Sequence, residues 1–149
     1  MNFTRLILCV SLLAVLPFTA CSAEDPKPQP APPSAHGPKP PLPAAVKNVG
    51  VEEFAKLRAS TNAVVLDVRT AKEFAAGHIP GAVNLDVNAP DFEKKAAALD
   101  KSKTYIVHCA AGIRSAQACV KMDKLKLTNL VNLDPGLKAW EKAGQPVER

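Results

Sequence analysis

A cysteine followed by small residues and then an arginine is the segment of this sequence best suited to chemistry. Residues 108–115 read His-Cys-Ala-Ala-Gly-Ile-Arg-Ser. Two alanines and a glycine allow the backbone to curl closely around the sulfur of Cys109, with several N–H groups turned inward. Such N–H groups, with the start of a following helix, bind anions and favour the thiolate form of a cysteine. Arg114 adds a positive charge at the rim, so we predict a nucleophilic thiol beside an anion site.

A buried structural cysteine is the simpler interpretation, because cysteine is among the residues most often found in cores. That interpretation gives no reason for small residues and then a basic one to follow. Cysteine-dependent phosphatases have one more residue between the cysteine and the arginine than the four that separate Cys109 from Arg114. The shorter loop suits a smaller group, such as one extra sulfur on the cysteine. It disfavours a phosphatase or an arsenate reductase.

The elements that must position this loop alternate between strands and helices. Short β-branched runs predict buried strands at 63–67, 82–85, 104–108 and 130–133. Helical spacing, and the capping box Thr70-Ala-Lys-Glu73, predict helices near 49–57, 70–77, 91–99, 115–126 and 136–143. This alternation predicts a mostly parallel sheet covered on both faces, with its chemistry beyond the carboxyl ends of the strands. That rule indicates the Cys109 loop and Asp67-Val-Arg69.

Other segments match the pattern of a known family. They are Val65–Arg69, Glu73-Phe74, Gly77–Asn84, Gly136–Trp140 and Gly144–Val147. With the cysteine loop, they make residues 48–149 resemble the rhodanese-like domain family, with Pro135 where the family often has glycine. The resemblance implies an α/β fold with a five-stranded parallel sheet flanked by helices on both faces.

The resemblance also implies a sulfurtransferase of the thiosulfate sulfurtransferase type. Cys109 would take the outer sulfur of thiosulfate or a similar donor as a persulfide and pass it to cyanide, a thiol or a protein cysteine. Arg114 would orient the donor, and no metal or organic cofactor is implied. The loop would bind donor and persulfide through Ala110, Ala111, Gly112, Ile113, Arg114 and Ser115. The alternative is a persulfide carrier or protein-binding module of the cell envelope that does not turn over.

Four further residues have both a functional and a structural interpretation. Asp67 and Arg69 either shape the rim of the site or form a structural ion pair, extended by Glu73; we favour the structural role. His108 is expected to bond its polar atoms internally. Cys119 is expected to point into the sheet rather than to act as a resolving cysteine. Short loops with few charged side chains predict an open pocket, which favours a protein acceptor.

The first 45 residues predict export. Residues 6–16 form an apolar run that is too short to span a bilayer and is typical of a secretory signal. Residues 18–21 read Phe-Thr-Ala-Cys and resemble the lipobox of bacterial lipoproteins, with Phe18 where leucine is usual. We therefore expect a signal peptide over 1–20, a lipid on Cys21 and a periplasmic protein held at the outer membrane by that lipid.

The linker and domain boundary follow from composition. Nine of the 14 prolines lie between Pro26 and Pro43, so residues 21–45 are predicted to be the lipidated N-terminus and a proline-rich linker. Residues 46–149 are predicted to be the domain. A net charge of +5 without a basic stripe argues against nucleic-acid binding. The four cysteines lack the spacing of a zinc site, so no metal is expected.

Overall fold

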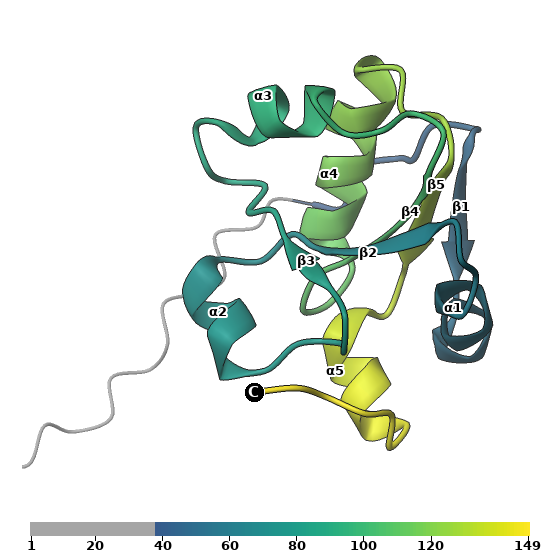
Figure 1. Ribbon diagram of the computed structural model, residues 1–149, viewed down its shortest axis with the longest axis vertical. Coiled ribbons are helices and arrows are strands. Elements are labelled where there is room, and N and C mark those ends of the chain that lie inside the picture. The colour runs from purple at the N-terminus through teal and green to yellow at the C-terminus, as the bar shows by residue number, and fades with distance from the viewer. Residues whose placement is uncertain (1–37) are drawn as a thin grey trace, which may run out of the picture. The chain divides into compact units, whose positions relative to one another are not determined.

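Five parallel strands form the sheet that carries the cysteine loop, in a computed structural model that describes residues 38–149 (Figure 1). The spatial order is β1-β5-β4-β2-β3. The strands are β1 (Val46–Val49), β2 (Ala63–Asp67), β3 (Val83–Asn84), β4 (Thr104–His108) and β5 (Leu130–Leu133). The predicted signal peptide, Cys21 and residues 21–37 of the predicted linker lie outside the described residues.

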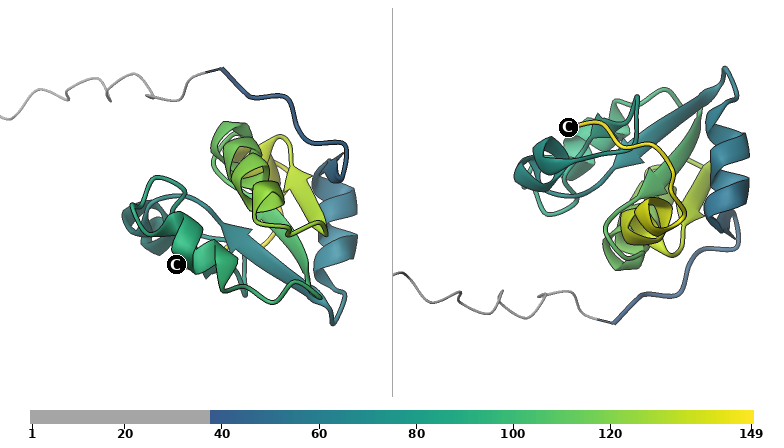
Figure 2. Two further views of the ribbon diagram at one scale, coloured as in Figure 1. Left: turned by 90° about the horizontal axis from the view of Figure 1, so that it is seen from above. Right: turned by 90° about the horizontal axis from the view of Figure 1, so that it is seen from below.

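Helices cover both faces of this sheet, which confirms the predicted architecture (Figure 2). One face packs against α1 (Val51–Arg58) and α5 (Gly136–Lys142). The other packs against α3 (Phe92–Ala97) and α4 (Ile113–Lys124). The short α2 (Ala71–Ala76) begins at the predicted capping box, in which Thr70 and Glu73 exchange hydrogen bonds.

Strand β4 lies at the centre of the sheet and has both faces buried. Its residues from Tyr105 to His108 are all buried, which explains the continuous apolar run in the sequence. On one side of it, the rings of Phe54 and Trp140 meet edge to face at 5.6 Å. On the other side, Phe92 and Met122 are almost fully buried. The loop after β4 therefore projects from a strand that is buried between the two helical layers.

Two elements differ from the sequence pattern. Strand β1 was not among the strands that the β-branched runs predict, because its central residues Lys47 and Asn48 are exposed and polar. Helix α4 begins at Ile113, two residues before the predicted start at Ser115. The left-handed backbone of Gly112, with φ of 86°, precedes the helix and lets it begin directly after the curled loop.

The chain contacts this unit before β1 begins. Leu42 packs against the core on the side of α3 and α4, and the Lys39 ammonium pairs with the Asp134 carboxylate after β5. Within residues 38–149, no helix has the combination of length and apolar character needed to cross a bilayer.

Candidate active site

Cys109 follows the last residue of β4 and lies at the carboxyl end of the sheet. Its Sγ accepts a hydrogen bond from the Gly112 N–H at 3.1 Å, so the loop closes around the sulfur as the residue types predict. The residue is only 1% exposed and lines a pocket of about 310 Å³. The thiol is therefore reached through this pocket and does not project from the surface.

Two glycines allow the backbone around the sulfur to pack tightly. A side chain at Gly112 would overlap the carbonyl oxygen of Asp134. A Cβ at Gly136 would lie 2.6 Å from the Ala110 carbonyl. The first turn of α5 is also bonded to the loop, because the Leu137 N–H donates to the Cys109 carbonyl at 2.7 Å. The start of α5 therefore holds the loop by hydrogen bonds from its first turn.

Arg114 is tied to Glu73 by two hydrogen bonds, each of 2.7 Å. The hydrogen bond from Arg114 lowers the pKa of Glu73 to about 2, and hydrogen bonds from Thr70 act in the same direction. The same pairing raises the pKa of Arg114. Both groups are therefore charged at neutral pH, and the charge of Arg114 is compensated at the wall of the pocket. The sequence did not predict this partner for Arg114.

Asp67 and Arg69 form a second and more deeply buried ion pair. In the sheet, Asp67 of β2 is paired with His108 of β4, so Asp67 lies beside the start of the loop. The Arg69 guanidinium donates to both carboxylate oxygens of Asp67 and also to the Gly77 carbonyl at 2.6 Å. This pair ties β2 to the end of α2, in agreement with the structural role. Glu73 does not join it, so that part of the expectation is wrong: its side chain turns to Arg114 instead.

His108 and Ser115 are buried polar residues whose side chains have no hydrogen-bond partner among residues 38–149. Neither ring nitrogen of His108 has a hydrogen-bond partner among the described residues, so the expectation that it bonds internally is wrong. The ring lies edge to face with Phe54 at 6.2 Å, and its Nε2 lies 3.8 Å from the Asp67 carboxylate, which is too far for a hydrogen bond. Burial lowers its pKa to about 4, so it is neutral at pH 7. The Ser115 hydroxyl, in the first turn of α4, is likewise unpartnered and has a proton to donate.

Cys119 lies in the core between α4 and the sheet, which confirms the expected inward position. It is fully buried, and both Cys109 and Cys119 are free thiols. Burial raises the pKa of Cys119 to about 12, so the residue stays a neutral thiol at physiological pH. It therefore lacks the thiolate that a resolving cysteine needs.

The pocket over Cys109 is more highly charged than the sequence predicts. Glu73, Arg114 and Lys138 all line it, so the expectation of few charged side chains is wrong. Lys138 was missed because it lies in α5, more than twenty residues after the cysteine, and only the packing of α5 on the loop brings it there. A neighbouring pocket of about 260 Å³ shares Glu73, Ala110 and Lys138 with the first.

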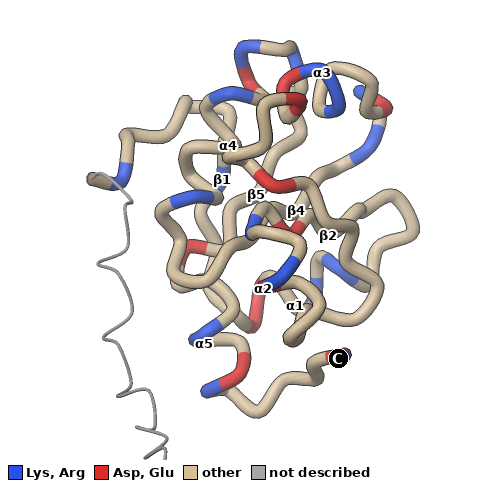
Figure 3. The backbone as a smooth tube through the Cα atoms, turned by 90° about the vertical axis from the view of Figure 1, so that its left-hand side faces the viewer, with Lys and Arg blue, Asp and Glu red and all other residues tan. Residues whose placement is uncertain are grey.

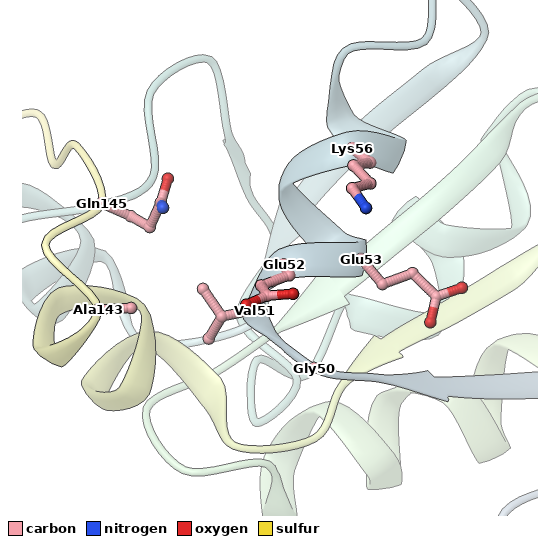
Figure 4. Close-up of a pocket in the computed structure, with 7 residues that line it drawn as sticks. All are labelled: Gly50, Val51, Glu52, Glu53, Lys56, Ala143 and Gln145. Carbon is pink, nitrogen blue, oxygen red and sulfur yellow. The ribbon is translucent and has the colours of Figure 1, made fainter.

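A larger pocket lies away from the cysteine. It has about 870 Å³, is formed by the start of α1 and the end of α5, and includes no residue of the Cys109 loop (Figure 4). Its lining residues are Gly50, Val51, Glu52, Glu53, Lys56, Ala143 and Gln145. Among residues 38–149, no group of three His, Cys, Asp or Glu side chains lies close enough together to hold a metal ion.

Comparison with known proteins finds relatives of this chain in sequence and in fold. The sequence pattern described as "Rhodanese-like domain" matches residues 50–143. The chain is 35% identical over 91 residues to a putative sulfurtransferase, YtwF, of Bacillus subtilis, covering 61% of this chain and 85% of that protein. It is 34% identical over 102 residues to the thiosulfate sulfurtransferase GlpE of Pseudomonas putida, covering 68% and 90%. A rhodanese-related protein from Thermoplasma volcanium superimposes with a TM-score of 0.61 at 27% identity, covering 68% of this chain and 97% of that one.

Proposed function

This chain belongs to the rhodanese-like domain family, which includes sulfurtransferases, and we propose that it moves the outer sulfur of thiosulfate or a related donor through a persulfide on Cys109. The observation that carries the proposal is the hydrogen bond from the Gly112 N–H to the sulfur of a thiol that lines a pocket. A backbone N–H aimed at sulfur stabilises negative charge there, both on the thiolate and on the persulfide that replaces it.

The transfer takes place in two displacements at sulfur. In the first, the Cys109 thiolate attacks the outer sulfur of thiosulfate, the S–S bond of the donor breaks, and sulfite leaves with the bonding electron pair. In the second, the thiolate of an acceptor, or cyanide, attacks the outer sulfur of the persulfide. The persulfide S–S bond breaks and the Cys109 thiolate is regenerated, so the cycle needs no net oxidant.

The residues around the cysteine have different roles in this transfer. The loop N–H groups from Ala110 to Ser115 bind the sulfur anion, and the free Ser115 hydroxyl is an additional donor. Arg114 acts as a positioning residue, because its two hydrogen bonds to Glu73 connect α4 to α2 at the wall of the pocket. Asp67 and Arg69 hold the neighbouring strand end in place.

The mass of the intact, fully reduced domain before and after addition of thiosulfate tests the proposal. We expect the gain of one sulfur atom, its removal by cyanide, and no gain in the Cys109→Ala variant. Absence of a gain in the reduced protein would overturn sulfur transfer from thiosulfate. A sulfur that is loaded but never passed to cyanide, a thiol or a protein cysteine would instead indicate a persulfide carrier.

We also propose that the protein is exported and held at the outer membrane by a lipid on Cys21, as the sequence of residues 1–21 supports. The full chain, expressed in a bacterium fed with labelled palmitate, should incorporate the label and fractionate with outer membranes. The Cys21→Ser variant should lose both properties. A wild-type chain that stays unlabelled and in the soluble fraction would overturn this proposal.

A further inference from the structure

The charges that line the pocket over Cys109 do not contribute equally to its field. Glu73 and Arg114 are joined by two short hydrogen bonds, so their charges largely cancel for an approaching ion. Lys138 is the third charged residue of the lining and makes no ion pair within residues 38–149. The positive charge that an incoming anion meets is therefore that of Lys138.

The fold fixes the position of Lys138 relative to the sulfur. Its backbone N–H donates to the Ala110 carbonyl at 3.1 Å, one residue beyond the bond from Leu137 to Cys109. The Gly136 backbone packs so closely against Ala110 that no side chain fits between them. Lys138 thus begins at the edge of the cysteine loop, while its side chain remains exposed and free to follow a ligand.

Lys138 also lies where two pockets meet. It lines the pocket over Cys109 and also the neighbouring pocket, whose lining includes Arg69 and Glu141. Charges of both signs follow one another along α5, from Lys138 to Glu141 and Lys142 (Figure 3). Of these three residues, Lys138 alone lines the pocket that contains the sulfur. The helix therefore presents a single cation to the reacting centre.

We propose that Lys138, rather than Arg114, is the specificity-determining residue that draws an anionic sulfur donor, of the class of thiosulfate, to Cys109. This inference rests on the proposed function for the identity of the donor. Arg114 keeps the positioning role that its pairing with Glu73 gives it. Lys138 supplies the uncompensated charge that favours a dianion over a neutral donor.

The first test compares rates of sulfur loading at Cys109 in Lys138→Gln, Lys138→Arg and Lys142→Gln. Lys142 is the matched control, because it is an exposed lysine on the same helix that lines neither pocket. A unit charge a few ångströms from a dianion, partly screened by solvent, changes the rate about ten-fold. We expect that loss with Lys138→Gln, little change with Lys138→Arg or Lys142→Gln, and a smaller loss at 1 M salt. Equal effects of the two glutamine variants would overturn the inference.

A second test needs no sulfur transfer. Iodoacetate is anionic and iodoacetamide is neutral, yet both alkylate a thiolate, so the ratio of their rates at Cys109 reports the local charge. Peptide mass mapping assigns the label to Cys109. We expect Lys138→Gln to lower the ratio about three-fold and Lys142→Gln to leave it unchanged. An unchanged ratio in Lys138→Gln would overturn the inference.

The two tests separate the inference from the proposed function. In one outcome, the wild-type protein fails to accept sulfur while Lys138→Gln still lowers the alkylation ratio. That result would contradict thiosulfate as the donor and would uphold anion selection by Lys138. A wild type that accepts sulfur at the same rate with and without Lys138, and with the same alkylation ratio, would uphold sulfur transfer and overturn the role of Lys138.

Discussion

Cys109 and Cys119 have the same side chain, lie ten residues apart and are almost equally buried, at 1% and 0% exposure. Both are free thiols of the same core cluster. They differ in what their sulfur atoms meet. The Cys109 sulfur accepts the Gly112 N–H and lines a pocket, whereas Cys119 lies within the helix–sheet core, where burial raises its pKa to about 12.

This difference shows that burial alone does not decide what a cysteine does. A thiol that is surrounded by apolar groups is held neutral, because nothing stabilises the thiolate. A thiol that is equally buried but faces backbone N–H groups can carry negative charge. The loop backbone is therefore the feature that distinguishes the surroundings of Cys109 from those of Cys119, and it can be altered without replacing either cysteine.

The largest effect on the free energy of unfolding is expected from Gly112→Ala, which alters the loop around the Cys109 sulfur. The new methyl group would occupy the space of the Asp134 carbonyl and would stand on a backbone with φ of 86°. Strain and overpacking together should cost about 3 kcal/mol of unfolding free energy. The loop must move away from the sulfur, so sulfur loading should fall by at least about a hundred-fold, as a loss of roughly 3 kcal/mol in transition-state stabilisation implies.

Gly50→Ala is the matched control for this substitution. Gly50 precedes α1, has an extended backbone with φ of −82°, and a Cβ there would meet nothing within 4 Å. Urea unfolding and mass measurement of sulfur loading should both be close to wild type for this variant. A Gly112→Ala protein that loads sulfur at the wild-type rate would show that the curled loop is not what activates Cys109.

A smaller effect on the free energy of unfolding is expected when each cysteine is replaced by serine. At position 119 the hydroxyl would be buried among apolar groups, which should cost about 2 kcal/mol of unfolding free energy. At position 109 the hydroxyl oxygen can accept the Gly112 N–H, so the cost should stay below about 1 kcal/mol. Urea unfolding of Cys119→Ser and Cys109→Ser measures the difference.

Sulfur loading should show the opposite order. Cys109→Ser should lose it entirely, and Cys119→Ser should retain it under conditions where the protein is folded. Cys119→Ala, which removes the sulfur without burying a hydroxyl, controls for the loss of packing. Equal destabilisation by the two serine variants would contradict the different surroundings that the structure assigns to the two thiols.

Local sequence signals were sufficient for four of the five strands and for the loop that closes around Cys109. Strands β2 and β4 are buried on both faces, which leaves continuous β-branched runs in the sequence. Cys109 was indicated by the residue types that follow it, since a tight loop requires small residues. Edge strand β1 has only two buried valines, separated by polar residues, and its pattern is too short to stand out.

The partners of the site residues could not be predicted in this way. Glu73 and Arg114 lie 41 residues apart, and only the position of α2 beside α4 brings them together. Lys138 is placed by the close packing of Gly136 on Ala110, which no local pattern encodes. Sequence therefore indicated which sulfur atom the loop closes around, whereas the charges near that atom depended on tertiary packing.

The smallest effect is expected from Glu73→Gln, which tests the ion pair beside Cys109. The Glu73 side chain is 36% exposed, so solvent screening reduces the pair to about 1 kcal/mol of unfolding free energy at pH 7. Because folding lowers the pKa of Glu73 from its usual 4.5 to about 2, this contribution is fully present above pH 4.5 and is lost as the pH falls toward 2. Urea unfolding at pH 6, 4 and 3 should show the difference between wild type and Glu73→Gln shrinking as the solution becomes more acidic. A difference that stays constant over this range would mean that Glu73 acts through packing and not through its charge, and Arg114 would then be an uncompensated cation beside Cys109.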